Sequence, residues 1–152
     1  MSEQKKSQQT PARKAPVIPA DMKAFNEKLI AEFRANQGQF TGDMAGRSLL
    51  ILTTTGARSG KPHSVVLGYG RHGDQIVVLA SDNGAPSAPD WYHNLLADPT
   101  ATVELAGPDR FQVRATPAQS GQREEFGKAT PYLAQQQSLT KREIPVVVLD
   151  RV

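Results

Sequence analysis

The residues with the clearest chemical potential lie in the segment 56–63, which reads GARSGKPH. Arg58 can bind a phosphate or carboxylate through two parallel hydrogen bonds, and Lys61 adds a compact positive charge. Gly56 and Gly60 permit backbone angles that other residues avoid, so backbone N–H groups can turn inward around an anion. The segment therefore indicates an anion-binding loop.

The spacing of this loop excludes the phosphate-binding loop of enzymes that hydrolyse ATP or GTP. That loop needs four residues between its glycines and a Ser or Thr directly after the Lys. Here three residues separate Gly56 from Gly60, and Pro62 follows Lys61. The segment is predicted to bind an anion that is not a magnesium-bound triphosphate.

The charges around the loop favour anion binding over the alternative, an ordinary solvated basic turn. No Asp or Glu occurs from residue 44 to residue 73, whereas Arg47, Arg58, Lys61 and Arg71 do. This part of the chain should be locally electropositive, which attracts anionic ligands.

A second candidate site lies in residues 81–92, SDNGAPSAPDWY. Small residues after a predicted strand lead into a predicted helix that begins near Pro89, a residue suited to the first helical position. Free backbone N–H groups in such a loop can bind an anion or a ligand carbonyl. Trp91 could cover a flat ring, although a single Trp more often packs in a core.

Three other patterns do not predict a site. Residues 68–73, GYGRHG, match the glycine pattern of dinucleotide-binding folds, but a predicted strand follows where a helix is required. The three histidines lack metal-site spacing and the chain has no cysteine, so no metal is predicted. The G-x-S-x-G sequence that presents the nucleophile of many hydrolases is also absent.

The candidate sites must be positioned by a mainly β (α+β) fold. Short stretches rich in β-branched residues predict strands at 48–55, 64–69, 75–81, 101–105, 111–115 and 144–149. Helical spacing of apolar residues predicts a helix over 21–37, and two short peripheral helices are predicted at 89–97 and 120–128. The short hairpin-like connections favour an antiparallel sheet of about six strands, closed into a small barrel.

Composition and charge indicate one domain behind a tail. Residues 20–152 are predicted to form a single domain, and residues 1–19 a disordered basic tail. The tail has four basic residues and one acidic residue, Glu3, so its net charge is +3. This equals the formal net charge of the whole chain. The domain is therefore neutral, and nucleic-acid binding is not predicted.

The expected location is the cytoplasm. The chain lacks cysteine, a signal peptide and an apolar run long enough to span a membrane. The basic tail and the helix after it suggest peripheral contact with the inner face of the membrane.

Taken together, the two candidate sites resemble those of the deazaflavin-dependent nitroreductase family, which comprises split β-barrel oxidoreductases that use coenzyme F420, an 8-hydroxy-5-deazaflavin. The resemblance lies in residues 49–63 (LLILTTTGARSGKPH), 80–99 (ASDNGAPSAPDWYHNLLADP) and 142–149 (REIPVVVL). It implies a split antiparallel β-barrel and hydride transfer from the reduced deazaflavin to an electrophilic acceptor.

The resemblance also assigns residues to the coenzyme. Those implied to bind it are Arg58, Ser59, Gly60, Lys61, Pro62, His63, Ser81, Asn83, Gly84, Ala85 and Trp91. The loop at 58–63 would hold the acidic phospholactyl-glutamate tail of the coenzyme. The deazaflavin ring and its phosphate would be bordered by Ser81, Asn83, Gly84 and Ala85, and Trp91 would pack along the same groove.

The resemblance implies that Ser81 or Tyr132 supplies the proton that accompanies the hydride. The expected acceptors are quinones, activated alkenes or enones, and nitroaromatics. Two alternatives stay open: a carrier that binds F420 without turnover, and a split-barrel oxidoreductase that binds FMN, which the anion-binding loop makes the less favoured cofactor. A monomer and a homodimer are both compatible with the sequence.

Overall fold

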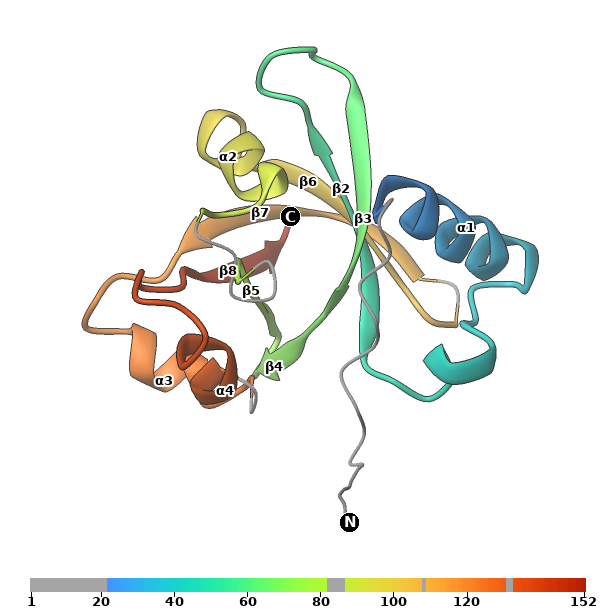
Figure 1. Ribbon diagram of the computed structural model, residues 1–152. Coiled ribbons are helices and arrows are strands. Elements are labelled where there is room, and N and C mark those ends of the chain that lie inside the picture. The colour runs from blue at the N-terminus through green and yellow to red at the C-terminus, as the bar shows by residue number, and fades with distance from the viewer. Residues whose placement is uncertain (1–21, 82–86, 108, 131–132) are drawn as a thin grey trace.

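The computed structural model describes residues 22–81, 87–107, 109–130 and 133–152 (Figure 1). The strands are β2 (Leu49–Thr55), β3 (Pro62–Gly68), β4 (Gly70–His72), β5 (Gln75–Leu79), β6 (Thr100–Leu105), β7 (Asp109–Pro117) and β8 (Val146–Arg151). The helices are α1 (Met22–Ala35), the 3-10 helix η2 (Gly42–Met44), α2 (Asp90–Ala97), α3 (Arg123–Gly127) and α4 (Leu133–Gln137).

All the strands belong to one antiparallel sheet with the order β3-β2-β6-β7-β8-β5-β4. Its two edge strands, β3 and β4, are consecutive in the chain and are separated by Tyr69 alone. The segment that contains both edges bends between Gly68 and Gly70, and glycine without a side chain allows such a bend. The sheet therefore curls into a half-barrel, as Figure 1 shows.

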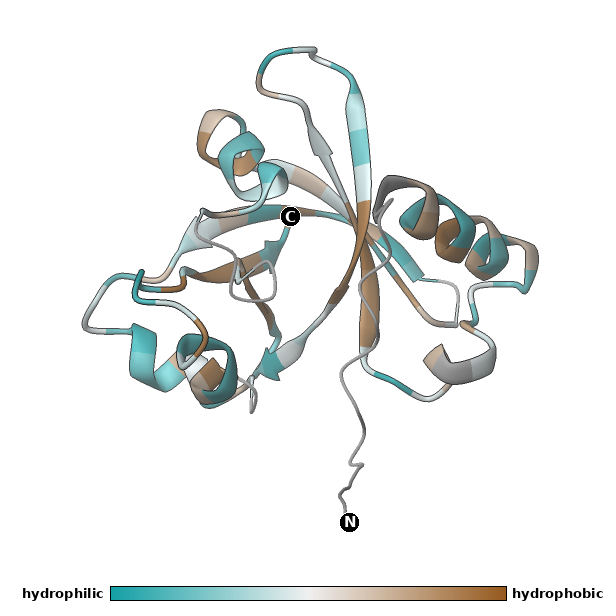
Figure 2. Ribbon diagram, in the orientation of Figure 1, coloured by the Kyte–Doolittle hydropathy of each residue, from teal (hydrophilic) through white to brown (hydrophobic). Residues whose placement is uncertain are grey.

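Hydrophobic residues are concentrated in the strands of the sheet (Figure 2), and on β2 they pack on both of its faces. On β2, Leu50 and Leu52 belong to the main core cluster, whereas Ile51 packs with Phe33 of α1 on the opposite face. This alternation follows from the two-residue repeat of a strand. The strands β2 and β3 are consequently covered on one face by the curl of the sheet and on the other by α1.

Polar contacts hold α1 against the sheet. Arg34 donates two hydrogen bonds to the buried carboxylate of Glu104 on β6, at 3.1 and 2.7 Å. The hydrogen bond to Glu104 raises the pKa of Arg34, and the negative charge of Glu104 raises it further. Asn26 accepts a hydrogen bond from the backbone N–H of Val66 at the free edge of β3, at 3.3 Å. The helix is therefore fixed at two points.

The predicted fold class is confirmed, with several differences in the elements. The sheet has seven strands among the described residues, because the three-residue strand β4 was not predicted. Strand β3 begins at Pro62 instead of residue 64, and β8 begins at Val146 instead of residue 144. The helices η2 and α4 were also missed, since a run of three to five residues is too short to show helical periodicity.

The described residues bear little on the predicted tail and on membrane contact. The predicted tail at 1–19 lies outside them. In the part of the chain that is described, no helix has the length and hydropathy needed to cross a membrane.

Candidate functional site

A groove of about 1150 Å³ opens beside the free edge of β3. Residues 47–49, 65–70 and 87–91 form most of its wall, and the wall is completed by Asn26, Leu79, Ser81, Ala129 and Gln136. The groove is slightly larger than the roughly 300–1,000 Å³ of most small-molecule sites, so it has room for a flat ring system and a second small molecule.

The groove brings together two residues that the sequence predicted, Ser81 and Trp91. Trp91 is only 5% exposed and belongs to the main core cluster, so it is both a core residue and part of the groove wall. Ser81 directly follows Ala80 at the exit of β5 and is half-buried. Other predicted site residues lie outside the described part of the chain, namely Asn83, Gly84, Ala85 and Tyr132.

A glycine allows the α3–α4 segment to close one end of the groove. A Cβ atom on Gly70 would overlap the carbonyl oxygen of Ala129, and both residues line the groove. The backbone of β4 and the backbone after α3 are therefore in direct contact. Any larger residue at position 70 would push this wall away.

The loop between β2 and β3 is tightly closed by its own hydrogen bonds. The N–H of Gly56 donates to the carbonyl of Lys61 at 2.8 Å, and the N–H of Gly60 donates back to Gly56 at 3.0 Å. Gly60 has a φ of +69°, which favours glycine. A Cβ atom on Gly56 would lie 2.5 Å from Ser59 Oγ. Both predicted glycines are thus required by the loop geometry.

Polar side chains order the inside of this loop. Ser59 Oγ accepts a hydrogen bond from the N–H of Lys61 at 3.1 Å and lies 3.1 Å from Nε2 of His63. His63 and Pro62 are not loop residues, because β3 already begins at Pro62. The loop therefore projects Arg58 and Lys61 from a short, rigid hairpin.

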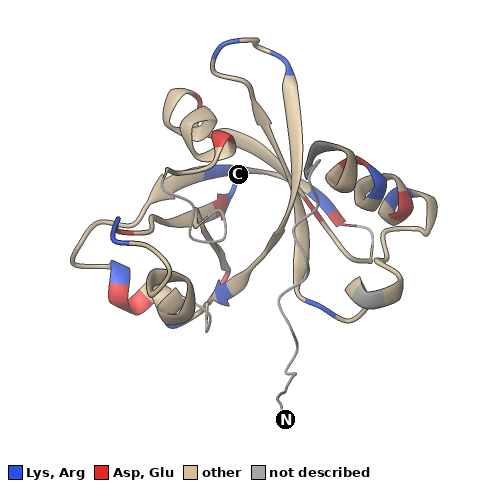
Figure 3. Ribbon diagram, in the orientation of Figure 1, with Lys and Arg blue, Asp and Glu red and all other residues tan. Residues whose placement is uncertain are grey.

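Arg58 and Lys61 are exposed, and neither has an ion-pair partner in the described part of the chain. Figure 3 shows basic residues and no acidic ones in the hairpin that joins β2 to β3. The loop does not line the groove. Lys61 lies four residues before Val65 of the groove wall, which is roughly 13 Å along the strand at a rise of about 3.3 Å per residue. A ligand that fills both places must be extended.

Helix α2 connects the loop to the groove through Asn94, a residue that sequence reasoning missed. The buried amide of Asn94 accepts a hydrogen bond from the N–H of Ala57 and donates one to Oγ1 of Thr54, both at 3.0 Å. Trp91 precedes Asn94 by three residues and so shares its helix face. One face of α2 thus places Trp91 in the groove and fixes the start of the loop. An amide within this otherwise apolar face was the available signal.

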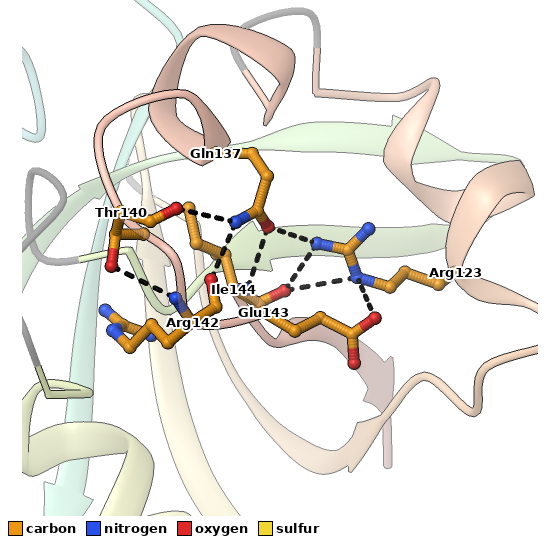
Figure 4. A network of polar contacts seen from close by, with 6 residues as sticks. All are labelled: Arg123, Gln137, Thr140, Arg142, Glu143 and Ile144. Carbon is orange, nitrogen blue, oxygen red and sulfur yellow. Dashed lines mark hydrogen bonds and ion pairs between the residues drawn. The ribbon is translucent and has the colours of Figure 1, made fainter.

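A polar network fixes the opposite wall of the groove (Figure 4). The side chain of Gln137 accepts hydrogen bonds from Arg123 Nη2 at 2.8 Å and from the N–H of Ile144 at 3.0 Å. It donates to the carbonyls of Thr140 and Arg142, at 3.3 and 2.6 Å. This network joins α3, α4 and the start of β8. No periodic pattern in the sequence indicates this network.

The same network reaches Ser81 through Arg142. Nη2 of Arg142 donates to the carbonyls of Ala80 and Ser81, at 3.2 and 2.8 Å. Two walls of the groove are therefore linked by one guanidinium group. Among the described residues, no group of three or more His, Asp or Glu side chains is arranged to hold a metal ion.

Comparisons with known proteins cover both the groove and the loop. The model of a family described as F420H(2)-dependent quinone reductase matches residues 27–151. The F420H(2)-dependent quinone reductase Rv1261c of Mycobacterium tuberculosis is 41% identical over 110 residues, which span 67% of this chain and 72% of that protein.

Solved structures show the same fold. An F420-H2 dependent reductase, FDR-A, has a TM-score of 0.60 and 32% identity, and the match covers 68% of this chain and 95% of that one. A structure described as a domain-swapped dimer has a TM-score of 0.61 and 30% identity, with 80% of this chain and 95% of that chain covered.

Proposed function

Because the chain belongs to the F420H(2)-dependent quinone reductase family, whose members are oxidoreductases with coenzyme F420 as cofactor, we propose that this enzyme reduces a quinone. The observation that carries the proposal is the arrangement of the groove and the loop. A groove lined by Trp91 lies on the same side of α2 as a rigid loop with two cations that have no ion-pair partner among the described residues. This arrangement matches a flat ring that continues into a polyanionic tail.

The described residues fit this coenzyme. Arg58 and Lys61 offer charge-assisted hydrogen bonds to phosphate and carboxylate groups, and no acidic side chain in the described chain competes for them. Trp91 and Ser81 would border the ring, as would the small residues 83–85, which lie outside the described chain. The distance between loop and groove requires an extended cofactor, which the phospholactyl-glutamate tail provides.

When bound, reduced F420 supplies a hydride. A quinone that receives this hydride also takes up one proton, and the product is the hydroquinone. Ser81 lines the groove, and its hydroxyl would pass a proton from the solvent that enters the open groove. Arg142 holds the backbone of Ser81 in place through its carbonyl. The protein thus contributes placement and a proton route, without a strong base.

Other acceptors and the carrier alternative make different predictions. Activated alkenes, enones and nitroaromatics stay candidate acceptors beside quinones. A carrier would bind F420 and reduce nothing, in contrast with the oxidoreductases of this family. An FMN enzyme would have little use for a cationic loop so far from the groove.

The test is an anaerobic turnover experiment. The protein is titrated with oxidised F420 and, separately, with FMN. It is then mixed with reduced F420 and either menadione, cyclohexenone or nitrobenzene, and the return of deazaflavin absorbance is followed against mixtures without protein. We expect binding of F420 in preference to FMN and the highest kcat/KM with menadione. Binding without reoxidation, or faster reoxidation by the enone, would contradict the proposal.

A further inference from the structure

Three consecutive glutamines on α4 lie in three different environments. Gln135 is exposed to solvent. Gln137 uses its side-chain oxygen and nitrogen in four hydrogen bonds. Gln136 lines the groove, and its side-chain oxygen Oε1 is buried without any hydrogen-bond partner. At successive positions the glutamine side chain is therefore exposed to solvent, buried with an unbonded oxygen, and fully hydrogen-bonded.

The unsatisfied oxygen of Gln136 stands out in the described chain. It is the only buried side-chain nitrogen or oxygen atom without a partner among the described residues. Buried polar atoms in folded proteins are nearly always bonded, because an unmade hydrogen bond costs the full desolvation of the group. An orphan atom in a groove wall thus indicates that a ligand supplies the missing donor.

The position of Gln136 is fixed by its neighbour. The four hydrogen bonds of Gln137 tie this turn of α4 to α3 and to the start of β8. Arg142 extends the same network to Ser81 on another wall of the groove. The backbone of α4 therefore cannot move easily to relieve the orphan oxygen. A ligand would therefore be met by rotation of the Gln136 side chain and not by movement of the helix.

We propose that Oε1 of Gln136 accepts a hydrogen bond from the hydroxyl of a hydroquinone, the reduced acceptor. This inference rests on the proposed function. Oε1 can only accept, and a quinone carbonyl has no proton to donate, so the bond forms as the acceptor gains its proton. An interaction that exists in the product-like state but not in the substrate lowers the barrier to reduction.

The same chemistry makes Gln136 a specificity-determining residue. Reduction of a quinone creates O–H groups, whereas reduction of an enone adds hydrogen to carbon and leaves a ketone. Only the first product satisfies Oε1. The amide of Gln136 therefore favours quinones over enones, although both accept a hydride.

The three glutamines allow a matched experiment. Gln135→Met, Gln136→Met and Gln137→Met each replace an amide by an apolar group of similar size and helix propensity. Each variant is measured for its urea unfolding midpoint, for its affinity for oxidised F420, and by calorimetry for 1-naphthol and 1-methoxynaphthalene. These two probes are stable to redox chemistry and differ in one hydroxyl donor.

Each variant has a distinct expected result. Wild type and Gln135→Met should bind 1-naphthol about tenfold more tightly than 1-methoxynaphthalene, the effect of one hydrogen bond. Gln136→Met should lose this preference, keep its F420 affinity, and unfold at the same or a higher urea concentration. Gln137→Met should unfold at a lower urea concentration. In turnover, Gln136→Met should lower the ratio of kcat/KM for menadione to that for cyclohexenone about tenfold.

Several outcomes would overturn the inference. An unchanged naphthol preference in Gln136→Met would show that Oε1 meets no ligand hydroxyl. A loss of F420 affinity with the preference intact would assign the amide to the cofactor. A lower unfolding midpoint would show that Gln136 supports the fold. The naphthol assay needs no turnover, so failure of wild type to reduce quinones would count against the proposed function alone.

Discussion

Arg58 and Lys61 lie at the tip of a hairpin whose backbone is closed by its own hydrogen bonds. Their side chains are long and unpaired within the described chain, so a ligand does not have to break ion pairs before it binds. Exposure has a cost, because salt screens such charges within about 8 Å at physiological ionic strength. Affinity for a polyanionic cofactor should therefore depend on both residues and on salt.

Arg58→Ala should weaken F420 binding at least tenfold, because it removes up to two charge-assisted hydrogen bonds worth about 1.5–3 kcal/mol. The loss should shrink as salt is raised from 50 to 500 mM, and equilibrium titration measures it. Arg114→Ala is the matched control, since Arg114 is an exposed cation on β7 outside the site. If both variants lose affinity equally, the effect is one of net charge and the loop is not the tail site.

Asn94→Leu should destabilise the protein and also weaken cofactor binding, although Asn94 belongs to α2 and not to the loop. The change leaves the N–H of Ala57 and the hydroxyl of Thr54 without partners, which costs about 2 kcal/mol in unfolding free energy. The loop start would also lose its anchor, so F420 affinity should fall severalfold. His93→Leu alters an exposed neighbour and should change neither quantity. If Asn94→Leu is destabilised but its affinity for F420 is unchanged, α2 does not influence cofactor binding by the loop.

At the residue scale, the residues that could be predicted from the sequence are those whose properties depend on the residue itself and its neighbours in the chain. Arg58, Lys61 and both loop glycines could be predicted because charge and backbone freedom are properties of single residues and their neighbours. Asn94 and Gln136 could not, because an amide is informative only when its burial and partners are known. Their roles depend on contacts between residues distant in sequence.

At the scale of elements, α1 depends on its pairing with the sheet. Arg34→Ala should lower the unfolding free energy by about 2 kcal/mol, less than for a fully buried pair, because Arg34 is half-exposed and Arg110 remains 3.7 Å from Glu104. Urea denaturation measures the loss. Glu104→Gln in the Arg34→Ala background should recover part of it by removing the buried charge. No recovery would mean that packing of the Arg34 stem, and not its charge, anchors the helix.

The contribution of Arg34 should not vary with pH near neutrality. Glu104 raises the pKa of Arg34, so the stabilisation is complete below the pKa that the guanidinium has in the unfolded chain. It disappears only as the pH rises through the higher pKa of the folded state, in strongly alkaline solution. A loss of the Arg34→Ala effect between pH 6 and pH 9 would contradict this account.

The elements predicted best are those with long periodic patterns. The central strands and α1 follow from alternating or helical apolar residues, and hairpin-like connections gave the antiparallel sheet. The short elements β4 and α4 were missed because they are stabilised by contacts with residues distant in the sequence. Gly70 lets β4 touch Ala129, and the Gln137 network holds α4. A local sequence pattern does not predict such contacts.

At the scale of the whole molecule, β8 lies in the middle of the sheet between β7 and β5. Amides of β8 such as Val147 and Val148 should exchange hydrogen only through global unfolding, because both are buried and paired on two sides. Amides of the exposed loop residues Arg58 and Ser59 should exchange orders of magnitude faster. Hydrogen-exchange NMR measures both. Exchange of β8 at a rate independent of denaturant would show local opening and contradict this expectation.

Contact of the tail at 1–19 with anionic lipid stays a prediction, since these residues lie outside the described chain. The basic tail would be attracted to anionic lipid vesicles, whereas the domain behind it has no net charge and would not be.

The place of β8 also has a consequence for biosynthesis. A ribosome delivers β2 through β7 before it delivers β8, yet β8 is the strand that joins β7 to β5. Until β8 emerges, β7 and β5 each have an open edge, in addition to the edges of β3 and β4, and these edges can pair with other chains. The protein must therefore complete its sheet after most of its sequence has been translated, and this late stage is where chaperones would have the most to protect.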